Sequence, residues 1–387
     1  MGLTRIFRGR RGALLVGAVA AATLWAPQAL AGGKNAVYVQ TNTAPANYVL
    51  AFDRNDDGTL GAAVRYATGG AGKPAANPPL GIPFLDTAGS VTLSQNGQLL
   101  FVVNAGNNTI SSFRVGSVGL ELADVKPSFG LRPVSSTSHG KLLYVLNSET
   151  AISSISGYRV DSNGSLTPIP GSVRATSQPV GGMPAQIQFD AKGGLLAVSE
   201  REAGAQGVIT LYAVGKDGVA GPPVAHPSVR KGPFGIAFTN QNLMIVSNEN
   251  FPDVGLSSVS SYDVSSSGVV AHRDTEPANA GGACWNVITN DGKYVLITSP
   301  FTLQINSFRI GKDGSLTPVT PTSVVATETG LTLDEALSHD SKYLYVLVSD
   351  FFASARIAAY AVNGDGTITP IGSSTSFEGS GSGAAAW

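Results

Sequence analysis

The chain has 387 residues, of which 13% are charged and 43% hydrophobic, whereas about 25% of an average soluble protein is charged. A disordered chain would have fewer apolar residues and a larger net charge than the −1 found here. Together with 47 glycines and 22 prolines, this composition excludes a disordered chain and predicts a folded protein with many turns.

The first 31 residues have the three parts of a secretory signal peptide. Four arginines precede an apolar run from Ala13 to Leu24, and Ala29-Leu30-Ala31 offers small residues at a cleavage point. An uncleaved anchor is disfavoured because the run is shorter than the roughly 20 residues that span a bilayer. We therefore expect residues 1–31 to be removed and the mature protein to be secreted or periplasmic, without a membrane span.

The mature chain would carry 21 basic and 26 acidic side chains, a net charge of −5. This balance lacks the basic excess of a nucleic-acid-binding protein. Cys284 is the only cysteine, and the four histidines have none of the short spacings of a zinc site. The Asp/Gly turns also lack the twelve-residue calcium loop with its final Glu. We expect no internal disulfide, no nucleic-acid partner, no metal and no cofactor.

One strand-like sequence motif that ends in an aromatic residue occurs seven times after the predicted signal peptide. Its aromatic residues are Phe52, Phe113, Tyr158, Tyr212, Tyr262, Phe308 and Tyr360. Neighbouring members are 45 to 61 residues apart. A repeat of about 50 residues with several strands is typical of β-propellers, whereas solenoid repeats are usually shorter.

Each repeat contains further predicted strands on either side of that motif. A hydrophobic run such as LLYVLN (142–147) comes before it, and a tight turn such as TNDGK (289–293) leads into that run from an earlier strand. A hairpin of the type DGSLTP (313–318) follows, in which Gly supplies the positive φ that a short turn requires. Four antiparallel strands make a propeller blade. We therefore predict that residues 32–387 form one all-β domain, a seven-bladed β-propeller.

The two ends of the mature chain are predicted to pair and so to complete the first blade. The first repeat begins at Val37 without an inner strand, and Gly381–Trp387 is left over after the last repeat. Pairing of this C-terminal segment with the first blade would close the ring and remove an exposed sheet edge. We expect a monomer whose stability depends on this closing strand.

Loops that enter the inner strand share one face of a propeller with loops that follow the second strand, and ligands commonly bind at such loop clusters. Among the residues that sequence position assigns to that face, we select eight candidates: Arg132, Phe234, Trp285, Asp334, Glu200, Arg201, Asn248 and Glu249. A carboxylate can activate water, and a guanidinium can hold a carboxylate or an oxyanion.

We take Glu200 and Glu249 as equivalent positions of neighbouring blades and, with Arg132, as the candidate catalytic residues. The candidate ligand-binding residues are Arg201, Trp285, Asp334, Phe234 and Asn248. The structural alternative is that Asn caps a turn, that Glu and Arg at loop tips are solvated, and that Trp285 packs between blades.

The repeats resemble the seven-bladed lactonase family, which includes propeller-type 6-phosphogluconolactonases and fungal carboxymuconate cyclases. The resemblance extends from about Val37 to Trp387. Its clearest segments are DSNGSLTPI (161–169), GKLLYVLN (140–147), ACWNVITNDGKYV (283–295), GKDGSLTPV (311–319) and ALSHDSKYLYVLV (336–348).

This resemblance implies hydrolysis of a sugar lactone, or lactonisation of a muconate-type acid, by acid/base side chains at the channel mouth without an essential metal. It also implies a site of His, Glu and Arg, of which this face offers the Glu and Arg but no histidine. Export disfavours a phosphorylated sugar lactone, because that is a cytoplasmic metabolite. Two hypotheses remain open: an exported lactonase that acts on a lactone or carbohydrate-derived ligand, and a non-catalytic exported propeller that binds a ligand or a protein partner.

Overall fold

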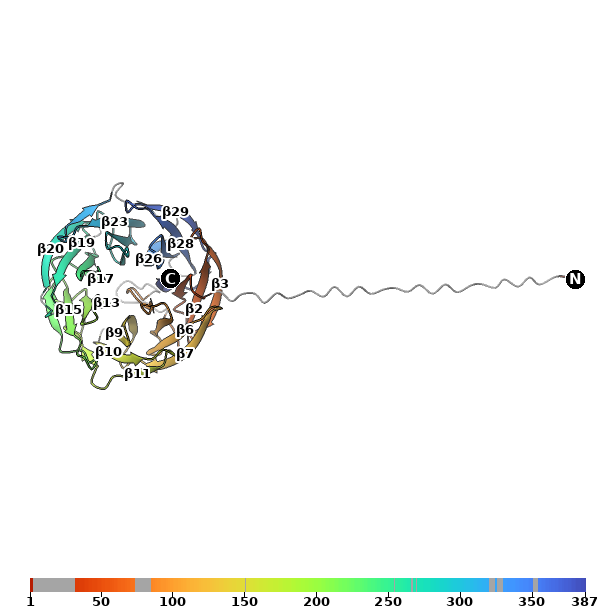
Figure 1. Ribbon diagram of the computed structural model, residues 1–387, viewed down its shortest axis with the longest axis horizontal. Coiled ribbons are helices and arrows are strands. Elements are labelled where there is room, and N and C mark those ends of the chain that lie inside the picture. Colours follow the sequence, from red (N-terminus) through yellow and green to blue (C-terminus); the bar gives the residue numbers. More distant parts are fainter. Residues whose placement is uncertain are drawn as a thin grey trace.

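The computed structural model describes ten ranges of the chain: 1–2, 32–73, 85–149, 151–253, 255–265, 267–268, 270–319, 324–325, 330–350 and 354–387. Except for its first two residues, the predicted signal peptide lies outside them. In the described ranges the secondary structure consists of strands without a helix, so none of these segments is a helix able to cross a membrane. Figure 1 shows seven twisted sheets arranged as a ring around one axis.

Each sheet is a blade whose main path consists of four antiparallel strands. The innermost strands are β31 (Ser382–Ala386), β4 (Val91–Leu93), β8 (Pro133–His139), β13 (Pro184–Phe189), β17 (Pro233–Phe238), β21 (Asn286–Ile288) and β26 (Leu331–Leu337). The second strands are β1 (Ala36–Gln40), β5 (Leu99–Asn104), β9 (Leu142–Glu149), β14 (Leu195–Glu200), β18 (Leu243–Asn248), β22 (Tyr294–Ser299) and β27 (Tyr343–Ser349).

The outer half of each blade faces away from the axis. The third strands are β2 (Tyr48–Arg54), β6 (Thr109–Val115), β10 (Ile152–Val160), β15 (Val208–Ala213), β19 (Ser258–Val264), β23 (Gln304–Ile310) and β28 (Ser354–Val362). The fourth strands are β3 (Leu60–Ala67), β7 (Leu120–Pro127), β11 (Leu166–Pro168), β16 (Val224–Pro227), β20 (Val270–Pro277), β24 (Leu316–Pro318) and β29 (Ile368–Ser373). Three short strands, β12 (Arg174–Ala175), β25 (Val324–Val325) and β30 (Phe377–Glu378), also pair with third strands.

The repeated aromatic residue lies in the third strand of every blade, and all seven copies are buried. In the antiparallel pairing of β9 with β10, Tyr158 lies opposite Leu143. Both belong to an apolar cluster with Phe101 and Val103 of the preceding blade. The repeat therefore marks the packing of one blade against the next, where burial of large aromatic side chains contributes most to stability.

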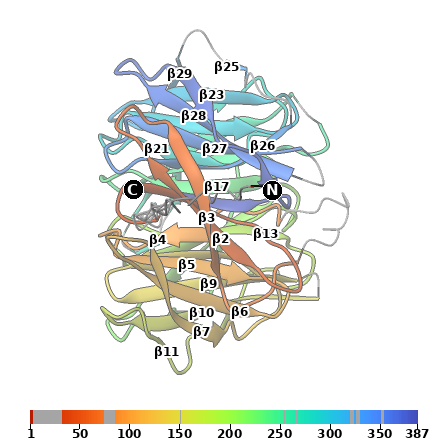
Figure 2. The same ribbon diagram turned by 90° about the vertical axis from the view of Figure 1, so that its right-hand side faces the viewer.

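The predicted closure of the ring is confirmed. Strand β31 pairs antiparallel with β1, with Ala386 opposite Val37 and Ala384 opposite Val39. The ring of Trp387 stacks on His339 of the last blade with centroids 4.0 Å apart. In the side view of Figure 2 the first blade, with β2 and β3, lies between the blade of β28 and that of β4. The chain therefore forms a closed seven-bladed propeller whose first blade combines both ends of the domain.

Candidate functional site

Two cavities lie along the axis, and no lining residue is common to both. The first, called the mouth cavity, has a volume of about 490 Å³ and lies at inner-strand entries and second-strand ends. Its polar lining residues are Asp86, Arg201, Glu202, Lys231, Glu249 and Cys284. Apolar side chains, among them Met183, Phe251, Trp285, Phe301 and Leu331, form much of the remaining wall.

The position of Glu249 depends on a glycine in the neighbouring loop. Gly232 enters β17 with φ of +68°, and a Cβ there would lie 2.7 Å from Cγ of Glu249. The amide of Glu249 also donates a hydrogen bond to Gly232 O at 2.9 Å. Because only a residue without a side chain fits here, the local sequence Lys231-Gly232-Pro233 lets Glu249 fold over the start of the inner strand.

Arg201 holds two carboxylates at the edge of the mouth cavity. Its Nη1 lies 2.8 Å from Asp86 Oδ2 and 3.5 Å from Glu249 Oε2. Its Nε donates to Met183 O at 3.3 Å, and its guanidinium carbon lies 5.2 Å from the centre of the Phe234 ring. With only 6% of Arg201 exposed, these contacts fix the guanidinium, so the charge is committed to Asp86 and Glu249.

Glu249 is the group of this cavity whose proton exchange falls near neutral pH. Burial raises the pKa of its carboxyl to about 7; the Arg201 charge opposes the rise, and Asp86 and Glu202 add to it. The Cys284 thiol lies 4.0 Å from Glu249 Oε2, and burial followed by the charges of Glu249 and Asp86 raises its pKa well above the usual value. Cys284 is therefore a neutral thiol at pH 7 and a poor nucleophile, whereas Glu249 has the pKa of a general base.

Lys231 supplies a second cation to the mouth cavity. It is half-buried, and none of the ion pairs found in the described ranges includes it. Its ammonium is therefore available to an anionic group inside the cavity, whereas the guanidinium of Arg201 is already paired.

The prediction that Glu200 and Glu249 occupy equivalent positions of neighbouring blades is wrong, because the two positions differ by one residue. Strand pairing places Glu200 opposite Pro184 and Asn248 opposite Pro233. Glu200 therefore corresponds to Asn248, while Glu249 corresponds to Arg201. A shift of one residue along a strand turns a side chain to the other side of the sheet, which explains why the two glutamates do not share a cavity.

Glu200 and Asn248 lie between strands and line neither axial cavity. The buried carboxylate of Glu200 accepts hydrogen bonds from the amide and hydroxyl of Ser177, at 3.0 and 2.7 Å, and from the Gln178 amide at 2.9 Å. Thr210 Oγ1 donates to it at 2.5 Å. Asn248 likewise donates to serine hydroxyls of β19. Both side chains tie the end of a second strand to its neighbours.

Arg132 is not brought to Glu249 either. Its Nη1 donates to Ser148 O at 3.0 Å and its Nη2 to Leu85 O at 3.2 Å. It lines a separate cavity of about 460 Å³ that also includes Glu149. The combination of Glu200, Glu249 and Arg132 predicted from the repeats is therefore not a single site in the structure.

Trp285 lines the mouth cavity, whereas Phe234 does not line it and instead packs against the guanidinium of Arg201. Their ring centroids are 4.9 Å apart in an edge-on arrangement. The indole Nε1 of Trp285 donates to Thr87 O at 3.1 Å. These rings belong to one buried apolar cluster with Ala88 and Ala185, which packs at the base of the mouth cavity.

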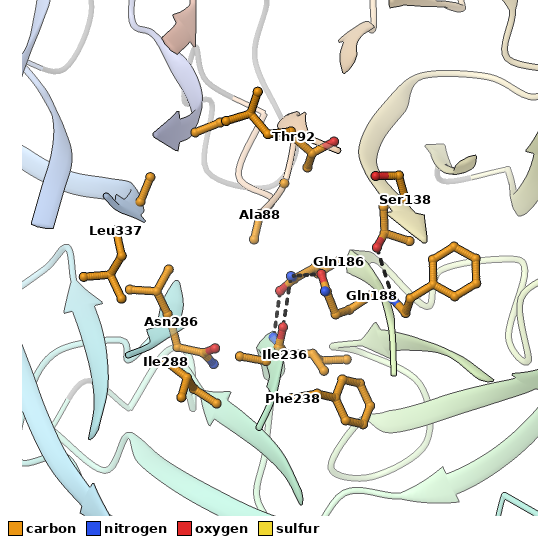
Figure 3. A pocket seen from close by; sticks show the side chains of 18 of the residues that line it. Ala88, Thr92, Ser138, Gln186, Gln188, Ile236, Phe238, Asn286, Ile288 and Leu337 are labelled. Atoms are coloured by element: carbon orange, nitrogen blue, oxygen red, sulfur yellow. Dashed lines mark hydrogen bonds between the residues drawn. The ribbon is translucent and has the colours of Figure 1, made fainter. Parts of the chain in front are cut away.

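Asp334 lies in the second cavity and not at the mouth. This channel cavity, of about 520 Å³, is lined by the inner strands and by hairpin turns of the opposite face. Figure 3 shows Gln186, Asn286 and Ser138 around its wall. Asp334 Oδ2 accepts from the Gly89 amide at 3.1 Å and Oδ1 from the Glu335 amide at 2.9 Å. Asp334 thereby links β26 to the loop before β4.

Sequence reasoning missed Asp86 and Lys231, and both precede an inner strand. Asp86 has a positive φ of 54°, as do Arg132 (54°) and Met183 (47°), which directly precede the prolines of β8 and β13. Asp86 is not followed by a proline, so the sequence does not reveal that it corresponds to Arg132 and Met183 in the other blades. Lys231 comes directly before the Gly-Pro pair of β17, and this motif could have revealed it.

Comparison with known proteins gives a family-model match over part of the chain and solved structures with the same fold. Residues 34–180 match the family model described as Lactonase, 7-bladed beta-propeller. A search of curated protein sequences finds no match. Within the described residues, no group of three or more His, Cys, Asp or Glu side chains is placed to hold a metal ion.

Solved structures with the same fold include two bacterial propellers with similar coverage. A periplasmic gluconolactonase from Pseudomonas aeruginosa has a TM-score of 0.70 and 18% identity, covering 90% of this chain and 98% of that one. A protein from Bacteroides fragilis described as a candidate 6-phosphogluconolactonase has a TM-score of 0.63 and 18% identity, covering 90% and 96%. The family match and the shared fold confirm the predicted resemblance to the seven-bladed lactonase propellers.

Proposed function

We propose that this protein hydrolyses a lactone in its mouth cavity, with Glu249 as the general base. The observation that carries the proposal is a buried carboxyl with a pKa of about 7, held next to a fixed guanidinium in a largely apolar cavity of about 490 Å³. A general base is most effective when its pKa lies near the working pH, and this volume is in the usual range of small-ligand sites.

In the proposed reaction, Glu249 takes a proton from a water molecule as its oxygen bonds to the lactone carbonyl carbon. The negative charge that develops on the carbonyl oxygen is stabilised by the Lys231 ammonium. The bond between that carbon and the ring oxygen then breaks, and the proton passes from Glu249 to the departing oxygen. The product is an open-chain hydroxy acid, which releases its carboxyl proton to solvent, and the resulting carboxylate pairs with Lys231.

Arg201 is a positioning residue in this scheme, because it acts through Glu249. Its fixed contacts with Asp86 and Met183 O hold the Glu249 carboxylate at the cavity wall. Removing its charge would also raise the pKa of Glu249 further, since the Arg201 charge lowers that pKa. Two separate properties of the base, its place and its proton affinity, therefore depend on one guanidinium.

We further propose an unphosphorylated sugar lactone as the substrate class and the periplasm or the exterior as the compartment. Three acids, Asp86, Glu202 and Glu249, line the mouth cavity with two bases, Arg201 and Lys231, so a dianionic phosphate would meet no excess of positive charge. The predicted signal peptide and the name of the P. aeruginosa relative, a periplasmic gluconolactonase, agree with this choice.

Non-catalytic binding is the second candidate, because Arg201 is already paired and aromatic side chains form much of the wall. The test is to follow proton release from glucono-δ-lactone and a panel of γ- and δ-lactones with purified residues 32–387. We expect Glu249→Gln to lower kcat by about 10²- to 10⁴-fold. Glu121→Gln is the matched control, since Glu121 is exposed and lies on the outer strand β7.

Rates of the wild type no higher than those of buffer across the panel would reject hydrolysis and leave the binding role. Equal rates for the wild type and the Glu249→Gln variant would reject Glu249 as the base. Determining the N-terminus of protein exported by a bacterial host tests the compartment, with Gly32 as the expected first residue.

A further inference from the structure

The charged residues of the mouth cavity come from one side of the ring only. The loops of the blades that contain β4, β13 and β17 contribute all of the charged residues in its described lining: Asp86, Arg201, Glu202, Lys231 and Glu249. The blades of β21 and β26, which are neighbours in the ring, contribute residues without a charge: Cys284, Trp285, Pro300, Phe301 and Leu331. The groups proposed for hydrolysis therefore lie on the charged side, and the apolar side has no part in that reaction.

The apolar side continues from a buried base to an exposed rim. Trp285 is 3% exposed and Leu331 6%, and both belong to one buried apolar cluster. At the rim, Phe301 is 45% exposed and Phe251, from the neighbouring blade of β17, is half-buried. Their ring centroids are 6.1 Å apart. Exposed apolar surface that continues into a cavity is typical of a ligand-binding groove.

The exposed ring of Phe301 is held in place by two glycines. Gly282, with φ of +74°, has no side chain where a Cβ would lie 2.9 Å from Cδ2 of Phe301. The amide of Phe301 donates to Gly281 O at 3.1 Å, and the Gly281 amide donates to Thr302 Oγ1 at 3.0 Å. Phe301 is therefore a fixed apolar surface, and a ligand that covers it does not have to order it first.

The apolar side offers few partners to a hydroxyl group. Only two side chains of its described lining carry a polar atom, Cys284 and Trp285. The indole Nε1 of Trp285 donates to Thr87 O at 3.1 Å, and a neutral thiol is a weak donor. A hydroxyl placed there would lose its water without an equal replacement, whereas an alkyl group gains from leaving water. A sugar lactone therefore has to turn its hydroxyls to the charged side, and the apolar side suits a hydrocarbon chain.

We propose that the mouth cavity also hydrolyses δ-lactones with an aliphatic chain on the carbon next to the ring oxygen, and that Phe251 and Phe301 bind this chain. The inference rests on the proposed function, because Glu249 and Lys231 act on the lactone as before: water adds to the carbonyl carbon, the bond from that carbon to the ring oxygen breaks, and a hydroxy acid forms. The chain diverges from the carbonyl group, so it lies on the apolar side when the carbonyl faces Lys231. Such a lactone is neutral, which suits a cavity with three acids and two bases.

A chain-length series tests the proposal. Proton release by residues 32–387 is followed with δ-valerolactone, which has no chain, and with δ-hexalactone, δ-octalactone and δ-decalactone, which carry chains of increasing length from methyl to pentyl. We expect kcat/KM to rise roughly two- to fourfold for each buried carbon. A series that is flat or falls, in a preparation that hydrolyses glucono-δ-lactone, would overturn the proposal and leave the proposed function intact.

Substitution of the two aromatic residues locates the chain. We expect Phe301→Ala and Phe251→Ala each to lower kcat/KM for δ-decalactone by about tenfold or more, mainly through KM, and to change kcat/KM for δ-valerolactone less than about twofold. Phe129→Ala is the matched control, since Phe129 is 49% exposed and does not line the mouth cavity. An equal loss for both lactones in Phe301→Ala would contradict a chain-binding role.

Binding of the chain can also be measured without hydrolysis. The lactams δ-valerolactam and 6-pentyl-δ-valerolactam have the shapes of δ-valerolactone and δ-decalactone, but their amide bond hydrolyses far more slowly, so calorimetry measures binding alone. We expect the pentyl lactam to bind about tenfold or more tightly than the other, and to lose this preference in Phe301→Ala. Equal affinities would reject the apolar site. Tighter binding of the pentyl lactam without hydrolysis of any lactone would retain the chain site and reject the proposed catalysis.

Discussion

The mouth cavity and the channel cavity both contain buried acids on the same axis, but the chain surrounds those acids differently. At the mouth, Glu249 and Asp86 share the guanidinium of Arg201. In the channel, the described wall has no lysine or arginine, and burial together with the charge of Asp334 raises the pKa of Glu335 well above its usual value. Burial alone therefore does not define the role of a carboxylate. The Arg201 counter-ion limits the rise in the pKa of buried Glu249, whereas burial without such a counter-ion favours the neutral acid at Glu335.

Deleting the closing strand should have the largest effect on stability. It should disturb the channel cavity more than the mouth cavity, because Ala384–Ala386 line the channel cavity and not the mouth. Deletion of residues 381–387 exposes the edge of β1 and removes the stack of Trp387 on His339. We expect a loss of more than about 5 kcal/mol in the free energy of unfolding, beyond the usual range of point substitutions. Urea denaturation of residues 32–380 measures it.

Trp387→Ala is the control for that deletion, since it keeps the strand pairing. It should cost clearly less than the deletion, although it removes an aromatic contact that packs over Gly97. Unchanged unfolding after the deletion would mean that β31 does not hold the ring together.

Arg201→Met should show the next largest effect, because it leaves Asp86 and Glu249 buried without their shared cation. Loss of one partner from a buried ion pair typically costs about 3–5 kcal/mol. Chemical denaturation at pH 7.5 checks this, and the Arg201→Met/Glu249→Gln double variant should recover part of the loss by removing one unpaired charge. A cost below about 1 kcal/mol would show that the mouth does not depend on its internal counter-ion.

The ring was predictable from the sequence because aromatic residues at third-strand positions, such as Tyr158, occur in every blade and pack against the preceding one. The site was only partly predictable. The end of a strand can be recognised in sequence, but its register with the neighbouring strand cannot. The predicted alignment of the two blades was wrong by one residue, so Glu249 and Glu200 do not occupy equivalent positions. Asp86 lies far from Arg201 in sequence, and no local pattern connects them.

The pH dependence of stability tests the raised pKa of Glu249 at the mouth when Glu249→Gln is compared with the wild type. The groups that face Glu249 are Arg201, Asp86, Glu202, Lys231 and Cys284. The folded-state pKa of Glu249, about 7, lies above its unfolded value of about 4.3. Its protonation therefore contributes stability that is fully present below about pH 4.3 and is lost as the pH rises through about 7.

The stability of Glu249→Gln relative to the wild type should thus increase between pH 5 and pH 8 and level off above. Thermal or urea unfolding of both proteins across this range measures the difference. A difference that stays constant from pH 5 to pH 8 would mean that the pKa of Glu249 is not raised. The same titration should lower kcat/KM about tenfold per unit below pH 7, because the proposed base must be ionised.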